Sequence, residues 1–139
     1  MNVLFLLTPK NDVEYVFDYY TLRQTLEKME YHRYSSIPMI NKDGKYIGVI
    51  SEGDILWFIK DKNNLNLFES EKISTLEVPR YRDYESVHVE TNIEDLFSKI
   101  LIQNFVPVVD DREIFIGIVT RKDVLNYFYK HLDAKKISQ

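Results

Sequence analysis

The feature that most constrains this chain is an internal repeat, which places two copies of one structural unit within 139 residues. The first copy has a proline in a short apolar segment, Pro38, and a Gly-apolar-apolar-Ser-x-x-Asp run that ends at Asp54. The second copy has the same features at Pro107 and Asp123, each 69 residues later (107 minus 38, and 123 minus 54). Because chance does not hold one spacing over so many positions, we expect two related halves.

Each copy predicts the order strand, helix, strand, strand, helix. The segments that begin at Leu22 and Ile93 carry apolar residues three and four apart, which indicates a helix with one buried face. The expected strands are residues 37–40, 46–50, 106–109 and 115–119, with shorter ones near 13–17 and 87–89. Each strand–helix–strand step should be a right-handed parallel crossover. The predicted fold class is α/β (α+β), with two βαββα motifs packed in pseudo-two-fold symmetry.

The predicted boundaries are a first motif at 8–61, a connecting strap at 62–84 and a second motif at 85–133. A copy of about 50 residues is at the margin of independent stability, so we expect both to form one module with one core. The strap begins polar but contains scattered apolar residues: Leu65, Leu67, Phe68, Ile73, Leu76 and Val78. We therefore expect it to be ordered.

Composition argues against several functions. The chain has 18 Lys and Arg against 22 Asp and Glu, and a net charge of -4 does not favour nucleic-acid binding. With no cysteine, thiol catalysis and Cys-zinc sites are excluded, and His32, His88 and His131 lack the spacing of metal ligands. No catalytic loop or triad is recognisable, so we expect a non-enzyme with no catalytic residues and no metal.

The apolar stretch near the start, residues 3–7, is too short to span a bilayer and lacks the flanks of a signal peptide. We therefore expect no membrane partner and a cytoplasmic location.

The Ser/Thr-x-x-Asp turns at Ser51–Asp54 and Thr120–Asp123 admit two interpretations. Each could simply be a capping box at the start of a helix. Alternatively, the helix N-terminus could bind a phosphate, while the aspartate accepts hydrogen bonds from ribose hydroxyls. The cap alone does not explain why aspartate recurs, nor why Gly48 and Gly117 precede the turns.

On these motifs, over residues 8–133, the chain resembles a tandem CBS domain pair, or Bateman module. It is also similar to stand-alone bacterial CBS proteins that bind cyclic di-AMP, through Val78-Pro79-Arg80 and Thr120-Arg121-Lys122. The resemblance implies a regulatory module that binds AMP, ADP, ATP, S-adenosylmethionine or cyclic di-AMP and signals occupancy to a separate, unknown effector protein, with no required cofactor. The alternative is a structural or protein-interaction module with no physiological nucleotide.

The resemblance also implies two ligand clefts, each shared between the copies. One would use Tyr34, Ser35, Ser36 and Ile37 with Thr120 and Asp123. The other would use Asn104, Phe105 and Val106 with Ser51 and Asp54.

The two clefts differ in charge. Arg121 and Lys122 follow Thr120, whereas Glu52 and Gly53 follow Ser51, so phosphate should prefer the first cleft unless these cations are only solvated helix-start residues. One departure from the cyclic di-AMP proteins is Glu14, an acid near the expected position of a dinucleotide's phosphates.

The helices that follow the motifs are unusually apolar. Residues 55–59 are apolar throughout, which indicates burial on more than one face. We expect a homodimer through both motif-bearing helices, with Trp57 or Phe58 near its centre. The alternative is that the strap covers the helix.

Overall fold

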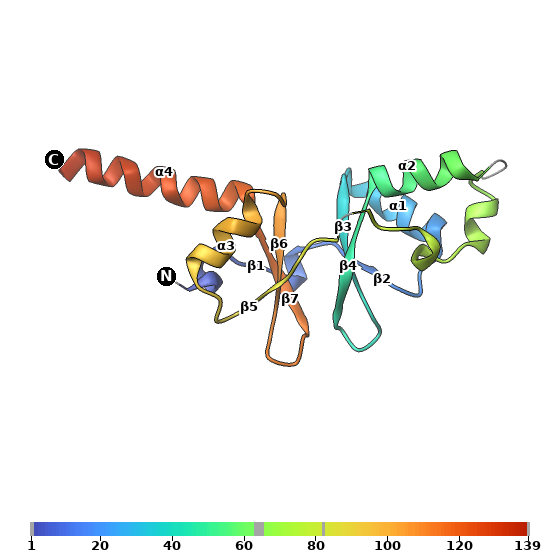
Figure 1. Ribbon diagram of the computed structural model, residues 1–139, viewed down its shortest axis with the longest axis horizontal. Coiled ribbons are helices and arrows are strands. Elements are labelled where there is room, and N and C mark those ends of the chain that lie inside the picture. The colour runs from blue at the N-terminus through green and yellow to red at the C-terminus, as the bar shows by residue number, and fades with distance from the viewer. Residues whose placement is uncertain (1, 63–65, 82, 139) are drawn as a thin grey trace. The chain divides into compact units, whose positions relative to one another are not determined.

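The computed structural model describes the backbone of residues 2–62, 66–81 and 83–138, and side chains as far as residue 132. The chain forms two compact units (Figure 1). One comprises Glu14–Tyr84, and the other comprises Met1–Val13 with Glu85–Gln139.

The unit of residues 14–84 is a three-stranded sheet with two helices. Its elements are β2 (Val16–Phe17), α1 (Leu22–His32), β3 (Ser36–Ile40), β4 (Tyr46–Ser51) and α2 (Glu52–Asp61). The strand order is β2-β3-β4, with β2 parallel to β3 and β3 antiparallel to β4. A capping box between Thr21 and Gln24 begins α1, and Arg33 ends it in the left-handed conformation, with φ of 58°.

The other unit repeats this design and adds an N-terminal segment. Its repeated elements are β5 (Val87–His88), α3 (Ile93–Ile100), β6 (Phe105–Val109), β7 (Phe115–Thr120) and α4 (Arg121–Ser138). The added segment consists of η1 (Val3–Leu6), β1 (Thr8–Pro9) and η2 (Lys10–Asp12). Since β1 pairs with β7, this sheet has four strands in the order β1-β7-β6-β5. The α/β prediction with two βαββα motifs is confirmed, whereas the strand β1 was not expected.

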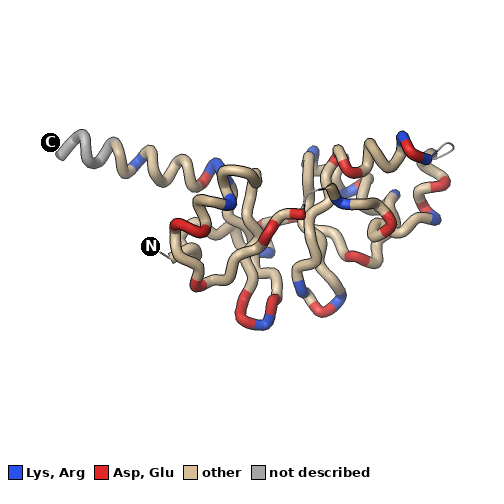
Figure 2. Tube along the Cα trace, in the orientation of Figure 1, with Lys and Arg blue, Asp and Glu red and all other residues tan. Residues whose placement is uncertain are grey.

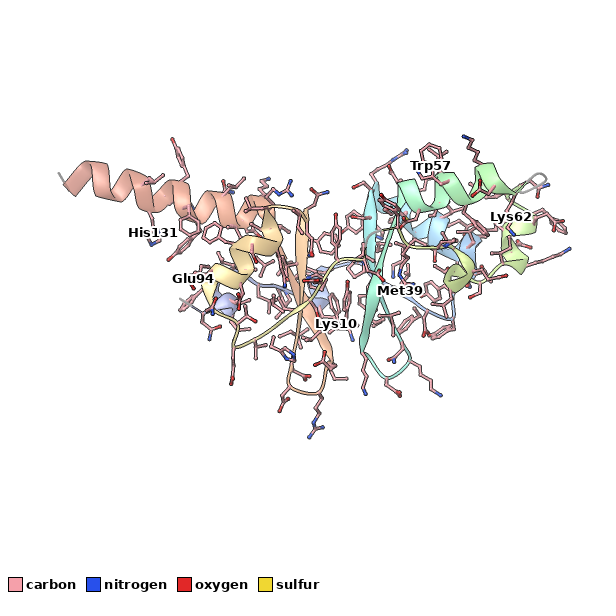
Figure 3. The ribbon with its side chains drawn as sticks, in the orientation of Figure 1. Lys10, Met39, Trp57, Lys62, Glu94 and His131 are labelled. Carbon is pink, nitrogen blue, oxygen red and sulfur yellow. The ribbon has the colours of Figure 1, made fainter. Side chains whose placement is uncertain are left out.

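Each unit has its own apolar core, in contrast to the single core that the sequence led us to expect. The first is built around Leu22, Ile37 and Ile50, and the second around Leu96, Val106 and Val119. Figure 3 shows how densely side chains fill the space between each sheet and its helices. Burial of such side chains is the main favourable contribution to folding, so each sheet holds its motif in place.

A proline lies in an inner strand of each sheet, Pro38 in β3 and Pro107 in β6, where a missing N–H would normally break a ladder. Pro38 lies opposite Val49 on the edge strand β4, and the N–H of Val49 points away from β3 and donates to Asp83. This pair is therefore one without mutual hydrogen bonds. On the other side of β3, β2 pairs only with Met39 and Ile40. No residue of β2 therefore lies opposite Pro38.

The described part of the strap is ordered, and it belongs to the unit of residues 14–84. It contains η3 (Glu69–Lys72) and η4 (Thr75–Glu77). The Thr75 hydroxyl lies 2.8 Å from that of Thr25 in a buried pair, and Val78 lies in the core. Leu65 lies outside the described residues. Residues 8–13 group with the second repeat, and the motif and strap boundaries stay predictions.

No helix in the described ranges combines the length and the apolar character needed to cross a membrane.

Candidate functional site

The first candidate site is the turn between β4 and α2, where Ser51 and Asp54 form a reciprocal cap. The Ser51 hydroxyl accepts a hydrogen bond from the Asp54 N–H at 3.1 Å, and Asp54 Oδ2 accepts one from the Ser51 N–H at 3.1 Å. The local sequence explains this arrangement, because a short acid three residues after a serine can reach back to the N-cap amide. The capping interpretation therefore holds at this turn.

The strap completes this turn by bonding the remaining oxygen of Asp54. Tyr81 donates its backbone N–H to Asp54 Oδ1 at 3.0 Å. Both carboxylate oxygens therefore accept a backbone hydrogen bond, and Asp54 is only 8% exposed. As the structure stands, the carboxylate is engaged by the chain itself.

Two further contacts hold the strap against β4. Asp83 Oδ1 accepts hydrogen bonds from the Val49 N–H at 3.3 Å and from Arg80 Nε at 2.7 Å. The Tyr46 hydroxyl donates to the Tyr84 carbonyl. Burial raises the pKa of Tyr46, and the negative charge of Asp83 raises it further, so the hydroxyl stays a proton donor.

The strap also explains Gly48, which the cap alone did not. A Cβ at this position would lie 2.5 Å from Asp83 Oδ1 and 2.9 Å from Arg80 Nε. In this structure the glycine makes room for the strap.

The second candidate site is the turn between β7 and α4, and it differs at the aspartate. The Thr120 hydroxyl accepts a hydrogen bond from the Asp123 N–H at 3.1 Å, as in the first turn. Within the part of the chain that the structure describes, the half-buried Asp123 carboxylate receives no hydrogen bond or ion pair. Its oxygens can therefore accept hydrogen bonds from a ligand.

The β7 edge is covered by a strand, whereas β4 is covered by side-chain contacts. Thr8 and Pro9 of β1 lie opposite Ile118 and Gly117 in antiparallel register. Gly117 has φ of +154°, and a Cβ there would lie 2.2 Å from the Thr8 carbonyl oxygen. This glycine is required by backbone conformation and by close backbone approach together.

The two cations after Thr120 have different surroundings. Arg121 donates from Nε to the Ile100 carbonyl at 2.9 Å and from Nη2 to the Leu101 carbonyl at 3.5 Å. It thus satisfies carbonyls at the end of α3, a favourable place for a cation. Lys122 is exposed. Figure 2 shows Lys and Arg where α4 begins, and Asp and Glu where α2 begins.

The segment before Pro38 was predicted to hold the base. Tyr34 is half-buried and its ring stacks on His32, with centroids 5.7 Å apart. Ser35 is exposed, Ser36 is half-buried, and the Ile37 side chain belongs to the core. A ligand could therefore reach the tyrosine and serine side chains but not that of the isoleucine.

Glu14 lies beside a lysine and a histidine. Its carboxylate is 3.4 Å from Lys28 Nζ and 3.5 Å from His32 Nε2. Lys28 thus offsets the negative charge of Glu14.

The corresponding segment of the second repeat is more buried. Asn104 is exposed, but Phe105 is 8% exposed and Val106 is fully buried. The Asn104 carbonyl accepts the Arg121 N–H at 2.9 Å, and the Ser35 carbonyl accepts the Glu52 N–H at 2.8 Å in the first repeat. Each segment is thus joined to the motif turn of its own unit. The pairing of each segment with the turn of the other copy stays a prediction.

Sequence reasoning missed the two segments that cover β4 and β7. A signal was present, since Thr8-Pro9-Lys10 and Val78-Pro79-Arg80 are similar triplets 70 residues apart (78 minus 8). The first covers β7, and the second leads into the contacts on β4. The repeat therefore extends further upstream than its apolar motifs indicate.

With this geometry in place, the class of protein is clear. Residues 6–61 and 77–130 match the CBS domain, and the chain belongs to the CBS domain family as a tandem pair. The prediction made from the repeat is confirmed. CBS pairs are in general nucleotide-sensing regulatory modules.

Three proteins are similar to this chain over two thirds of its length or more. The uncharacterized protein MJ1426 of Methanocaldococcus jannaschii is 30% identical over 122 residues, covering 68% of this chain and 73% of that protein. Cyclic di-AMP receptor B of Bacillus subtilis is 27% identical over 99 residues, covering 71% of this chain and 67% of the receptor. The crystal structure of CbpB in complex with c-di-AMP superposes with a TM-score of 0.88 at 25% identity, covering 100% of this chain and 91% of that one.

Proposed function

We propose that this chain is a non-catalytic regulatory module that binds an adenine nucleotide and signals its occupancy to a separate protein. Cyclic di-AMP is the first candidate ligand, because one similar protein is named a cyclic di-AMP receptor and CbpB was crystallised in complex with c-di-AMP. AMP, ADP, ATP and S-adenosylmethionine share the adenosine group and are the other candidates. The observation that carries the proposal is the open carboxylate of Asp123 beside the capped start of α4.

The residues of this turn suit the parts of a nucleotide. The first N–H groups of α4 and its positive dipole end favour a phosphate, and the exposed Lys122 adds a positive charge. Asp123 would accept hydrogen bonds from ribose hydroxyls, with the Thr120 hydroxyl beside it. The adenine would lie against Tyr34, Ser35 and Ser36, with the Ile37 side chain serving only the core.

The ligands differ in what they can offer Asp123. AMP, ADP and ATP have two vicinal ribose hydroxyls, whereas each ribose of a 3′,5′-linked cyclic di-AMP keeps only its 2′-hydroxyl. Asp123 could accept two hydrogen bonds from AMP but only one from a ribose of cyclic di-AMP. The loss on removing the carboxylate should therefore be larger for AMP.

Calorimetric titration with all five ligands tests the proposal. We expect at least one to bind the wild type, and Asp123→Ala to weaken it, with the larger loss for ligands that have vicinal hydroxyls. Absence of binding by every ligand would contradict the proposal. It would support the second candidate, an interaction module without a nucleotide, which the fully engaged Asp54 favours at the first turn.

We further propose that the signal passes through a homodimer formed by α2 and α4. Leu56 and Trp57 on α2 are each 58% exposed, and Leu125 and Tyr129 on α4 are 60% and 66% exposed. Trp57 projects away from the sheet of its unit (Figure 3). Phe58, the other expected centre of the interface, is 8% exposed in the core of its own unit, which leaves Trp57 as the anchor.

Light scattering of the wild type and of Trp57→Asp at matched concentrations tests the dimer. We expect a wild-type mass near twice 16.6 kDa and a monomeric variant. The control is Tyr31→Asp, which changes an exposed aromatic residue on α1, and it should leave the mass unchanged. A monomeric wild type would contradict the proposed assembly.

A further inference from the structure

Part of the strap lies across the first motif turn and bonds the groups that a ligand would need. We call Arg80, Tyr81, Asp83 and Tyr84 the latch segment. Three of its contacts reach the turn and strand: Tyr81 to Asp54, Asp83 to Val49, and Tyr84 to Tyr46. Figure 1 shows the strap, in yellow-green, returning past the start of α2 to β4.

These contacts leave Asp54 no easy way to accept a ribose. Asp54 Oδ1 could accept a second hydrogen bond, but Asp54 is only 8% exposed and Tyr81 is bonded to this oxygen, so a ribose hydroxyl would reach it only after the Tyr81 backbone moved away. Displacing the other hydrogen bond would undo the cap of α2. The equivalent carboxylate of Asp123 requires neither step.

We propose that the latch segment closes the first motif's nucleotide site, so that the Thr120–Asp123 site fills first and the Ser51–Asp54 site fills only when the latch segment is released. This inference rests on the proposed function, because it assigns different states to the two sites. In this account Tyr81 occupies the acceptor that a ribose hydroxyl would use.

The latch segment is held by contacts that can open without unfolding the unit. Asp83 is an exposed acid, and its hydrogen bond from Val49 is long, at 3.3 Å. Among the described residues, no strand pairing joins this segment to β4, in contrast to β1 on β7. Single hydrogen bonds of this kind contribute little net stability, so ligand binding can compete with them.

The residue after the latch segment belongs to the other unit. Glu85 follows the latch segment directly, and its N–H donates to Gln103 Oε1 at 2.9 Å. Its carboxylate binds Lys99 Nζ at 2.8 Å, and this bond lowers the pKa of Glu85. The residue that follows the latch segment is thus fixed within the other unit by its contacts with Gln103 and Lys99.

The first test is binding stoichiometry with AMP as the probe, for the wild type and Asp83→Ala. The substitution removes the acceptor for Val49 and the partner of Arg80. We expect the wild type to bind one AMP per chain with high affinity, and Asp83→Ala to bind a second at least tenfold more tightly than the wild type does. Asp111→Ala removes the same charge from an exposed position with no hydrogen bond in the described residues, and should match the wild type.

A second measurement needs no variant. Amide hydrogen exchange of the wild type at Tyr81 should be slow without AMP and should accelerate only at the AMP concentrations that fill the weaker site. Acceleration at the first equivalent would overturn the inference, as would two equal sites in the wild type or an unchanged second site in Asp83→Ala. If no variant binds any of the five nucleotides, the proposed function fails as a whole, whereas equal filling of two sites contradicts only the latch segment's role.

Discussion

The two motif turns share one sequence pattern but leave their aspartates in different states. In both turns a Ser or Thr hydroxyl caps the helix at 3.1 Å. Asp54 is then engaged by two backbone amides and is nearly buried, whereas Asp123 is engaged by none in the described residues. The difference arises because the strap bonds Asp54 at the first turn, whereas β1 pairs with β7 at Gly117 and Ile118. The motif alone therefore does not determine whether a carboxylate can accept a ligand.

The glycines give the largest expected contrast between the two repeats. Gly117→Ala would force a Cβ to within 2.2 Å of a backbone oxygen at a positive φ, so we expect a loss of roughly 3 kcal/mol in the free energy of unfolding. Gly48→Ala meets only the side chains of Asp83 and Arg80, which can move, and should cost about 1 kcal/mol. Urea denaturation of both variants measures the difference. Equal losses would mean that the β1 and strap contacts are equally rigid.

The aspartates should separate binding from stability. Asp123→Ala removes an acceptor that the described residues do not use, so nucleotide affinity should fall by about 1.5–3 kcal/mol, or roughly ten- to a hundredfold, with little change in unfolding. Asp54→Ala breaks the cap and the Tyr81 contact and should lower stability by about 1–2 kcal/mol. Calorimetry and thermal unfolding of both variants test this. The reverse assignment of effects would refute the distinction between the turns.

The hydrogen bond from the Tyr46 hydroxyl to the Tyr84 carbonyl should depend on pH. Because its pKa is raised in the folded state, its contribution to stability is complete below the unfolded pKa of about 10 and is lost as the pH rises above that value. Tyr46→Phe should cost about 1 kcal/mol at neutral pH. The difference between wild type and variant should shrink above pH of about 10, as measured by urea denaturation at several pH values. A constant difference would show that the hydroxyl has no role in holding Tyr84.

Substitution of the two cations after Thr120 should give the smallest effects, one on stability and the other on nucleotide binding. Arg121→Ala removes hydrogen bonds to the end of α3 and should lower stability by about 1 kcal/mol. Lys122→Ala should leave stability unchanged and weaken AMP binding a few-fold, with a flatter dependence on salt. Adenosine, which has no phosphate, is the control ligand and should be unaffected by Lys122→Ala. An equal loss for adenosine would exclude a phosphate contact.

Much of the fold followed from local patterns. The apolar run around Pro38 and the helical spacing from Leu22 each lie inside one unit, where burial on one face fixes the element. The strand β1 was missed because two residues, Thr8 and Pro9, have no periodicity to detect and become a strand only by pairing with β7.

The residue types of the candidate site were predictable from the sequence, but not which of these side chains a ligand could contact. The Ser/Thr-x-x-Asp pattern correctly gave the caps at Ser51 and Thr120. It could not show that Tyr81 bonds Asp54, since that contact joins residues 27 apart through a backbone amide that any residue would supply. Nor could it show that Arg121 turns back to α3, because an exposed and an anchored arginine look the same in sequence.

The most direct test of the account is a titration of isotopically labelled protein with cyclic di-AMP, followed by amide chemical shifts. The account predicts that the amides of residues 120–123 shift at the first additions, while those of residues 51–54 and Tyr81 move only later. Equal and simultaneous shifts at both turns, or shifts confined to residues 51–54, would contradict it.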